Sequence, residues 1–292
     1  GQDAARKYGM ENMRGEFFTF SDQDDLLDEE ALESMHRAIN EDQSDVVQGR
    51  ALSFVFNKHF VLGLAYYDSG IMSERRVMDH DTFMSRHYRS FFGVNDMPVF
   101  MWSKLYRSSI IPDINNIPIS VSNVEDLFFN MYIMPYARRI SLLPKTVYCW
   151  RHGGTSHQFS DKWIDIYRKA FHLKKQQIEK LNLPFEFLRS TAVELINVGA
   201  YHLKLTVEFK NPDDDILFKR IREIRSLPEM EEAIAIIKKE DKYHTPIFDA
   251  FVEGDAGKMA EVIRRHPIKR LFKKLMRSTF YTITSIIDRC MG

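Results

Sequence analysis

Cysteine, net charge and long apolar runs are all scarce in this sequence, and each absence excludes a class of protein. Its 292 residues include only two cysteines, Cys149 and Cys290, which show no metal-ligand spacing and cannot build a disulfide framework. Lys and Arg total 41, as do Asp and Glu, so no overall charge points to a nucleic-acid partner. No apolar run has the length that crosses a bilayer. We therefore expect a cytoplasmic protein that does not bind nucleic acid.

An initiator methionine is also absent, and the strongest strand signal comes early. The chain begins with Gly1, and its first buried-strand pattern, Phe17 to Phe20, follows almost at once. An α/β domain normally has several strands before its functional turn, so we expect an amino-terminal part to be missing from this chain. The 292 residues, of which 44% are hydrophobic and 28% charged, allow one large domain or two ordinary ones.

The apolar run from Phe17 to Phe20 ends in three carboxylates, Asp22, Asp24 and Asp25. Aromatic and β-branched residues in a short run predict a buried strand. Strands of α/β sheets present their functional residues at their carboxyl ends. Carboxylates this close repel one another unless a cation lies among them. A hard divalent metal that also holds phosphates suits such oxygen ligands.

A helix start offers another explanation for the same acids. Asp is a good N-cap, and Asp and Glu stabilise the first helical turn. The acids at 28–30 precede apolar residues at helical spacing, which are Ala31, Leu32, Met35, Ala38 and Ile39. A calcium loop is excluded, because Leu26 stands where such a loop needs a further oxygen ligand. The local sequence leaves the metal–phosphate and helix-capping explanations open.

A second pair of acids, Glu125 and Asp126, opens a predicted helix. A carboxylate in the first turn is stabilised by the helix dipole and stays ionised, which suits a general base. Any well-capped helix shows the same pattern. Upstream, Trp102 and Lys104 belong to a run that would line a wall and offer a cation to anions or sugar hydroxyls. From the local sequence alone, a short core helix with surface cations explains that run better.

A polar loop follows the strand predicted over residues 140–150. It contains Arg151, His152, Ser156 and His157. Cations and hydroxyls on a flexible loop could close on a phosphate, whereas loop histidines are more often structural or solvated. The local sequence leaves both roles open.

Beyond residue 160 the pattern becomes helical. Apolar residues at helical spacing predict helices over residues 161–181, 185–205, 216–224 and 230–237. Over residues 267–287 apolar residues form one stripe and Lys and Arg the other. Such a helix suits an anionic membrane surface, which would place the protein peripherally on the inner face of the cell membrane. A terminal helix docked on its own protein explains the pattern equally well.

Six short motifs follow one another in a fixed order. They are Ala5-Arg6-Lys7-Tyr8-Gly9, Gly15-Glu16, Phe20-Ser21-Asp22-Gln23-Asp24-Asp25, Trp102-Ser103-Lys104-Leu105-Tyr106, Glu125-Asp126-Leu127-Phe128-Phe129 and Tyr148-Cys149-Trp150-Arg151. Their order and spacing resemble the family 2 glycosyltransferases of GT-A fold, most closely the bacterial enzymes that build capsule, exopolysaccharide or cell-wall glycans. The resemblance implies an α/β fold. A GT-A, Rossmann-like nucleotide-sugar domain, truncated at its start, would cover residues 1–159, and an all-helical region would cover residues 160–292.

The resemblance also implies a reaction and a role for each motif. The protein would transfer a sugar, with inversion, from a nucleoside-diphosphate sugar to a glycan or lipid-linked acceptor in bacterial surface polysaccharide synthesis. We expect a UDP-sugar donor and a Mn²⁺ or Mg²⁺ cofactor, which would neutralise the departing diphosphate. The implied site comprises the metal ligands Asp22, Asp24 and His152, the donor-binding residues Arg6, Asp22, Arg151 and Ser156, the acceptor-binding residues Trp102 and Lys104, and the general base Asp126 beside Glu125.

The chain departs from the family pattern in two places. Lys7 stands where the family usually has Asn, which affects that contact but not the metal site. The family's opening strand and acidic nucleotide-binding segment are absent, so we assign activity to the intact protein and expect the chain as it stands to be inactive. One alternative is a non-catalytic or truncated transferase-like scaffold or partner protein. Another is a different metal-dependent nucleotide enzyme, which would want a Gly-rich phosphate loop that is not visible here.

Overall fold

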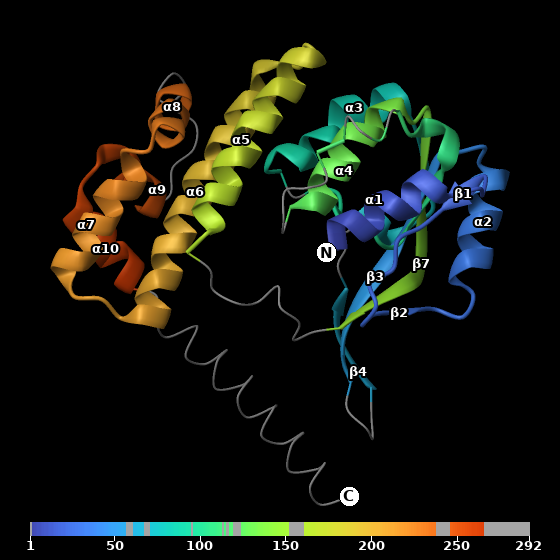
Figure 1. Cartoon of the computed structure of the whole chain (residues 1–292), viewed down its shortest axis with the longest axis horizontal. Coiled ribbons are helices and arrows are strands. Elements are labelled where there is room, and N and C mark those ends of the chain that lie inside the picture. Colours follow the sequence, from blue (N-terminus) through green and yellow to red (C-terminus); the bar gives the residue numbers. More distant parts are fainter. Residues whose placement is uncertain are drawn as a thin grey trace, which may run out of the picture. The chain divides into compact units, whose positions relative to one another are not determined.

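The computed structural model describes residues 2–56, 61–66, 71–94, 96–112, 114, 117–118, 124–151, 161–237 and 246–265. They belong to two compact units (Figure 1). The sheet unit comprises Gly1–Phe56 and Val61–His157, and the helical unit contains Gln158–Gly292. The domain boundary predicted between residues 159 and 160 lies outside the described residues and stays a prediction.

A mixed sheet of seven strands forms the centre of the sheet unit (Figure 1). Its strands are β1 (Phe17–Phe18), β2 (Leu26–Leu27), β3 (Val46–Phe56), β4 (Val61–Tyr66), β5 (Arg76–Asp79), β6 (Lys104–Arg107) and β7 (Arg139–Arg151). They lie in the order β1-β6-β3-β7-β2, with β4 added to β3 and β5 added to β7. Strands β3 and β7 run parallel, and the other described pairs are antiparallel.

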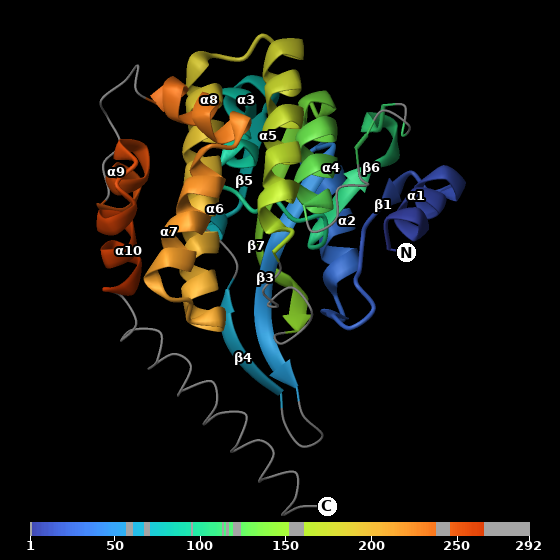
Figure 2. The ribbon, with the colours of Figure 1, turned by 60° about the vertical axis from the view of Figure 1, so that its left-hand side comes forward.

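The long parallel pair β3–β7 organises this sheet. Its register runs from Val46 opposite Ile140 to Phe54 opposite Arg151. The register shifts beside Gly49, where a Cβ atom would lie 2.3 Å from Cγ2 of Val147. Only a residue without a side chain allows the two strands to approach this closely. Strand β4 continues the sheet along the far half of β3 as a long antiparallel ribbon (Figure 2).

Helices cover both faces of the sheet, and two neighbouring residues of β6 show it. Leu105 packs into the core beneath α2 (Ala31–Glu41), whereas Tyr106 packs against Phe129 of α4 (Glu125–Ile133), with 5.6 Å between ring centroids. Successive side chains of a strand point to opposite faces, so α2 and α4 lie on opposite sides. The unit also contains the helices α1 (Gln2–Asn12) and α3 (His80–Arg86), and the 3-10 turns η1 (Ile71–Ser73), η2 (Tyr88–Phe92), η3 (Ser108–Ile110) and η5 (Met134–Tyr136).

The helical unit, whose helices are labelled in Figure 2, has a hydrophobic core of its own. Its described helices are α5 (Trp163–Lys180), α6 (Phe185–Lys210), α7 (Asp214–Arg225), α8 (Pro228–Ile237), α9 (Pro246–Glu253) and α10 (Ala256–Arg264). Asp213 and Asp255 cap α7 and α10 by accepting main-chain N–H groups of the first turn. Helix α6 ends at Asn211, whose φ of 42° is left-handed.

The predicted fold class is confirmed, with an α/β sheet unit followed by a helical unit. Two local predictions were wrong. The run at residues 101–107, for which local sequence favoured a core helix, contains strand β6. The strand predicted over Phe17 to Phe20 pairs only at Phe17 and Phe18, because the chain then turns toward the acidic cluster. In the part of the chain that the structure describes, no helix is both long and apolar enough to cross a membrane.

Candidate active site

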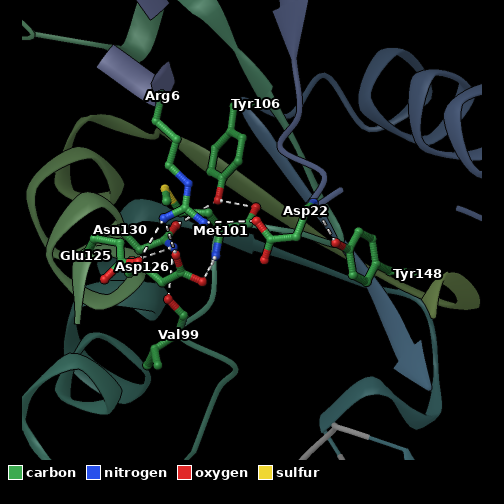
Figure 3. Close-up of polar contacts among 9 residues, drawn as sticks. All are labelled: Arg6, Asp22, Val99, Met101, Tyr106, Glu125, Asp126, Asn130 and Tyr148. Carbon is green, nitrogen blue, oxygen red and sulfur yellow. Dashed lines mark hydrogen bonds and ion pairs between the residues drawn. The ribbon is translucent and has the colours of Figure 1, made fainter. Parts of the chain in front are cut away.

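Arg6 joins the two acidic motifs of the sequence (Figure 3). Its guanidinium lies 3.0 Å from Oδ1 of Asp22, 3.1 Å from Oε1 of Glu125 and 3.3 Å from Oδ1 of Asp126. Arg6 projects from α1, Asp22 follows β1, and the other two acids begin α4. The Arg6 side chain is 10% exposed. The fold therefore gathers carboxylates that lie far apart in the sequence around one buried cation.

This cluster sets three carboxylates around one guanidinium, and burial perturbs the pKa of Asp126 within it. Burial raises the pKa of Asp126 to about 6, while Arg6 and a hydrogen bond from Met101 oppose the rise. The main-chain N–H of Met101 donates to Oδ2 of Asp126 at 3.3 Å. A carboxyl group whose pKa lies close to neutral is well suited to accept a proton during a reaction.

Glu125 adds a second acceptor to the same place. Its Oε1 accepts from Arg6, whereas its Oε2 is buried and has no hydrogen-bond partner among the described residues. Buried polar atoms are nearly always paired, so an unpaired acceptor at this position is suited to a donor from a bound molecule. The arrangement can thus take up a proton and orient a hydroxyl group.

Tyr148 of β7 holds the loop that contains Asp22, Asp24 and Asp25. Its hydroxyl accepts the main-chain N–H of Asp22 at 3.0 Å and donates to Oδ2 of Asp25 at 2.7 Å (Figure 3 shows the first contact). The other oxygen of Asp25 accepts the main-chain N–H of Arg151 at 2.7 Å. Burial raises the pKa of Asp25, although these hydrogen bonds lower it. Asp25 therefore ties the loop to β7 with both of its oxygens.

Asp24 is the acid of this loop that remains exposed to solvent. Its side chain is exposed and makes no hydrogen bond or ion pair with the described residues. Among those residues, no group of three or more His, Cys, Asp or Glu side chains is arranged to hold a metal. Mg²⁺ is commonly held by one or two carboxylates together with substrate phosphates instead of by an all-protein cage. The open carboxylate of Asp24 fits that mode of binding.

The two predicted acceptor-binding residues lie in the interior of the unit. Trp102 is 8% exposed, and its ring stacks on Phe100 and Tyr148 with centroid distances of 3.6 and 4.7 Å. Lys104 is fully buried, and its ammonium donates to the main-chain carbonyls of Pro98 and Phe100. Both side chains support the wall of the site in this structure. A contact between either residue and an acceptor would need them to move.

The other predicted residues follow β7. Arg151 ends the strand and contributes its main-chain N–H to Asp25. His152 and Ser156 lie outside the described residues, as does the basic segment 267–287, so the roles predicted for them stay predictions.

Sequence reasoning missed three residues that shape the site, Tyr106, Asn130 and Tyr148. Tyr148 lies in one of the six motifs, but nothing local shows that its hydroxyl reaches the acidic loop. Asn130 follows Asp126 by four positions, which places both on one helix face, and that spacing is the available signal. Tyr106 also lies in one of the six motifs, but nothing local shows that its hydroxyl reaches Met101 and Asn130.

The comparisons with known proteins concern the family and the fold of the chain. Residues 1–94 match the model of a family described as Glycosyl transferase family 2. These residues therefore resemble a family 2 glycosyltransferase domain. The matched residues include Arg6 and the acidic cluster, and the resemblance inferred from the six motifs is confirmed.

Two curated proteins and a solved structure extend the comparison. Glycosyltransferase GlyA of Streptococcus pneumoniae is 25% identical over 72% of this chain and 30% of its own length. EpsH of Bacillus subtilis is 29% identical over 52% of this chain and 42% of its own. This chain therefore spans less than half the length of either relative.

The solved structure is that of TarS residues 1–349 from S. aureus, and it supports the fold alone. It superposes with a TM-score of 0.55 and 18% identity, covering 89% of this chain and 68% of TarS 1–349. A structure of the same TarS fragment in complex with UDP-GlcNAc superposes with a TM-score of 0.55, 18% identity, and coverage of 87% and 68%. The fold expected from the GT-A resemblance is confirmed.

Proposed function

We propose that the protein is an inverting, metal-dependent glycosyltransferase that moves a sugar from a UDP-sugar to a glycan or lipid-linked acceptor of the bacterial surface. The observation that carries the proposal is the convergence of Asp22, Glu125 and Asp126 on Arg6. This convergence supports a site in which a donor-side acidic loop would lie beside a partly buried base. The family match and the names of the relatives support sugar transfer.

On the donor side, Asp24 and Asp22 would hold Mn²⁺ or Mg²⁺ against the diphosphate. When bound, the metal neutralises charge on the departing nucleoside diphosphate. The chain's own contribution is to hold the loop still, since Tyr148 and Asp25 fasten it to β7. The TarS complexes with UDP-GlcNAc and with UDP favour a uridine nucleotide as the first donor to test.

On the acceptor side, Asp126 would take the proton of the attacking hydroxyl, and Oε2 of Glu125 would accept a hydrogen bond from the acceptor. The hydroxyl oxygen then bonds to the anomeric carbon as the bond to the diphosphate breaks. Attack from the face opposite the leaving group inverts the anomeric centre. Glycosyl transfer passes through an oxocarbenium-like state, so the base can remove the proton of the acceptor hydroxyl late in the attack.

The donor side is tested by binding. The full-length protein is mixed with UDP-GlcNAc and with other UDP-sugars, with and without Mn²⁺, and its melting temperature is recorded. We expect stabilisation that needs the metal and is lost in Asp24→Asn. Asp81→Asn is the matched control, because Asp81 is an exposed acid in the first turn of α3. A full-length protein that responds to no nucleotide sugar would favour the scaffold alternative.

The membrane surface is a separate part of the proposal and rests on sequence alone. Residues 267–287 combine an apolar stripe with a basic one, which favours anionic lipid. The test is co-sedimentation of the full-length protein with phosphatidylcholine vesicles and with vesicles that also contain phosphatidylserine. We expect binding to the anionic vesicles that weakens as salt is added. Equal binding to both vesicle types would contradict the electrostatic argument.

A further inference from the structure

A short segment beside Asp126 is held in an unusual way. Residues 98–101 precede β6, and each of their four main-chain carbonyls accepts a hydrogen bond from a buried side chain. Lys104 donates to the carbonyls of Pro98 and Phe100, Asn130 to that of Val99, and Tyr106 to that of Met101. The hydrogen bonds of sheets and helices normally satisfy main-chain carbonyls. In residues 98–101, buried side chains take the place of those main-chain donors.

The three donors come from β6 and α4, and Figure 3 shows the contacts of two of them, Tyr106 and Asn130. Lys104, Tyr106 and Asn130 are all fully buried, with no exposed surface. The Tyr106 hydroxyl lies 3.1 Å from the Met101 carbonyl oxygen and 2.9 Å from Oδ1 of Asn130, so it shares its proton between them. Nδ2 of Asn130 reaches the Val99 carbonyl at 3.0 Å and the Asp126 carbonyl at 3.1 Å. The network therefore fastens β6, the segment and α4 together.

This segment contacts Asp126 through one hydrogen bond, which the main-chain N–H of Met101 donates to Oδ2 of Asp126. A main-chain donor cannot be adjusted by a rotamer, so its aim depends on how firmly the segment is held. Asn130 lies one turn after Asp126 on α4, which ties the same helix turn to the segment from the other side. The carboxylate is thereby fixed between the Met101 N–H and the Arg6 guanidinium.

We infer that Lys104, Tyr106 and Asn130 are positioning residues, which hold residues 98–101 so that the Met101 N–H aims the Asp126 carboxylate at the acceptor hydroxyl. This inference rests on the proposed role of Asp126 as the general base. None of the three side chains needs to touch the substrate. Geometry errors of about 1 Å at a catalytic group can cost on the order of a hundredfold in rate, so the support of a base is part of its function.

The test compares two buried tyrosines that serve the same helix. Tyr106→Phe removes the hydroxyl that holds Met101 and Asn130. Tyr88→Phe is the matched control, because the Tyr88 hydroxyl is also fully buried and donates to the Met131 carbonyl on α4 at 2.6 Å. Both variants lose a hydroxyl contact in the core, so we expect similar losses of thermal stability. Only the first should affect the chemistry.

The activity readout is release of UDP from UDP-GlcNAc by the full-length protein, in which water replaces the acceptor hydroxyl. For Tyr106→Phe we expect kcat to fall about tenfold, with the KM for UDP-GlcNAc within about twofold of wild type. The acidic limb of the pH profile should move up by about half a pH unit, because a looser N–H stabilises the carboxylate less. Arg6, Asp22, Glu125 and Lys104 also face Asp126 electrostatically, and this variant leaves them in place.

A second readout does not need turnover. The side-chain ¹³C signal of Asp126, assigned with Asp126→Asn in protein labelled at aspartate, reports the carboxyl titration directly. We expect its midpoint to rise in Tyr106→Phe and to stay at the wild-type value in Tyr88→Phe. If Tyr106→Phe does not fold, Asn130→Leu provides a second comparison, because it removes the donor to the Val99 and Asp126 carbonyls without removing a charge.

The outcomes distinguish a failure of the proposed function from a failure of the positioning role. Wild-type protein that releases no UDP from any UDP-sugar contradicts the proposed function, and the carboxyl titration still tests the positioning network. Wild-type activity with an unchanged kcat, pH limb and titration midpoint in Tyr106→Phe overturns the positioning role and leaves the proposed function standing. A kcat that falls equally in Tyr106→Phe and Tyr88→Phe also overturns it, because general core damage would then explain the effect.

Discussion

Two arginine–carboxylate clusters, one in each unit, shift the pKa of a carboxyl group in opposite directions. In the sheet unit, the single Arg6 faces Asp22, Glu125 and Asp126. In the helical unit, Glu229 is bound by Arg168 at 2.7 Å and by His172 at 3.0 Å, and Arg168 also pairs with Asp165 at 3.1 Å. The pKa of Asp126 is raised to about 6, mainly by burial. That of Glu229 is lowered to about 2, mainly by its hydrogen bonds from Arg168.

The difference distinguishes an ion pair built for stability from one built for chemistry. Glu229 accepts three side-chain hydrogen bonds from Arg168 and His172 and stays ionised throughout the physiological range. The sheet unit leaves carboxylates in excess, which lowers the stability of the empty site and keeps one of them able to take a proton. Strongly shifted pKa values occur in both kinds of cluster, so the sign of the shift carries the functional information.

The largest effect is expected for Asp126→Asn, which removes the proposed base. UDP release from UDP-GlcNAc should fall by about a thousandfold, since a positioned base contributes roughly 10²–10⁴ in rate. Metal-dependent donor binding, measured by thermal shift, should stay at the wild-type level. The sign of the stability change is also predicted. The folded-state pKa of Asp126 lies above its unfolded value near 4, so its ionisation costs stability as pH rises toward about 6, and the variant should unfold at higher urea concentration at pH 7.

Two results would count against this assignment. Loss of donor binding in Asp126→Asn would move the residue to the donor side. A variant that keeps wild-type UDP release would remove Asp126 from the reaction.

A smaller effect is expected for Arg6→Met, which removes the guanidinium that pairs with the three carboxylates. Breaking a buried ion pair by removing one partner typically costs about 3 kcal/mol of unfolding free energy, and urea unfolding at pH 7 measures this loss. Because Arg6 opposes the rise in the pKa of Asp126, its removal should raise that pKa further and move the acidic limb of kcat/KM up by about one pH unit. An unchanged limb would show that Arg6 is not coupled to the base.

The smallest effect on activity is expected for Glu229→Gln, which weakens the contacts of Glu229 with Arg168 and His172 in the helical unit. UDP release should stay within about twofold of wild type. The folded-state pKa of Glu229 lies below its unfolded value, so its contribution to stability is present above about pH 4.5 and is lost as pH falls toward about 2. At pH 7 the variant should lose about 1 kcal/mol of unfolding free energy, and less at pH 3. A large loss of activity would contradict the division of roles between the two units.

The fold class and most helices follow from the sequence because their signals are local. Ala31, Met35 and Ala38 of α2 recur at helical spacing, and all three are buried as that pattern predicts. Strand β6 was missed because its four residues follow Ser103, whose positive φ of 59° turns the chain sharply. No residue-level signal marks that turn, since serine rarely adopts such a conformation.

The site was only partly predictable, for a related reason. The acids were found from their clustering and from the family-like order of motifs. Their meeting at Arg6 depends on the packing of α1, the loop after β1 and α4, which are far apart in the sequence. Lys104 and Trp102 have the residue types of a sugar-binding wall, yet their burial depends on the segment 98–101 and on Tyr148. Burial of that kind is a property of tertiary packing.

The most direct test of the central claim is the pH dependence of kcat/KM for UDP release by the wild-type full-length protein. If Asp126 is the base, the rate falls tenfold per unit as pH drops below about 6, because protonation removes the acceptor of the hydroxyl proton. A rate that stays constant down to pH 4.5, with donor still bound, would show that no buried carboxyl group of this kind takes part in the reaction.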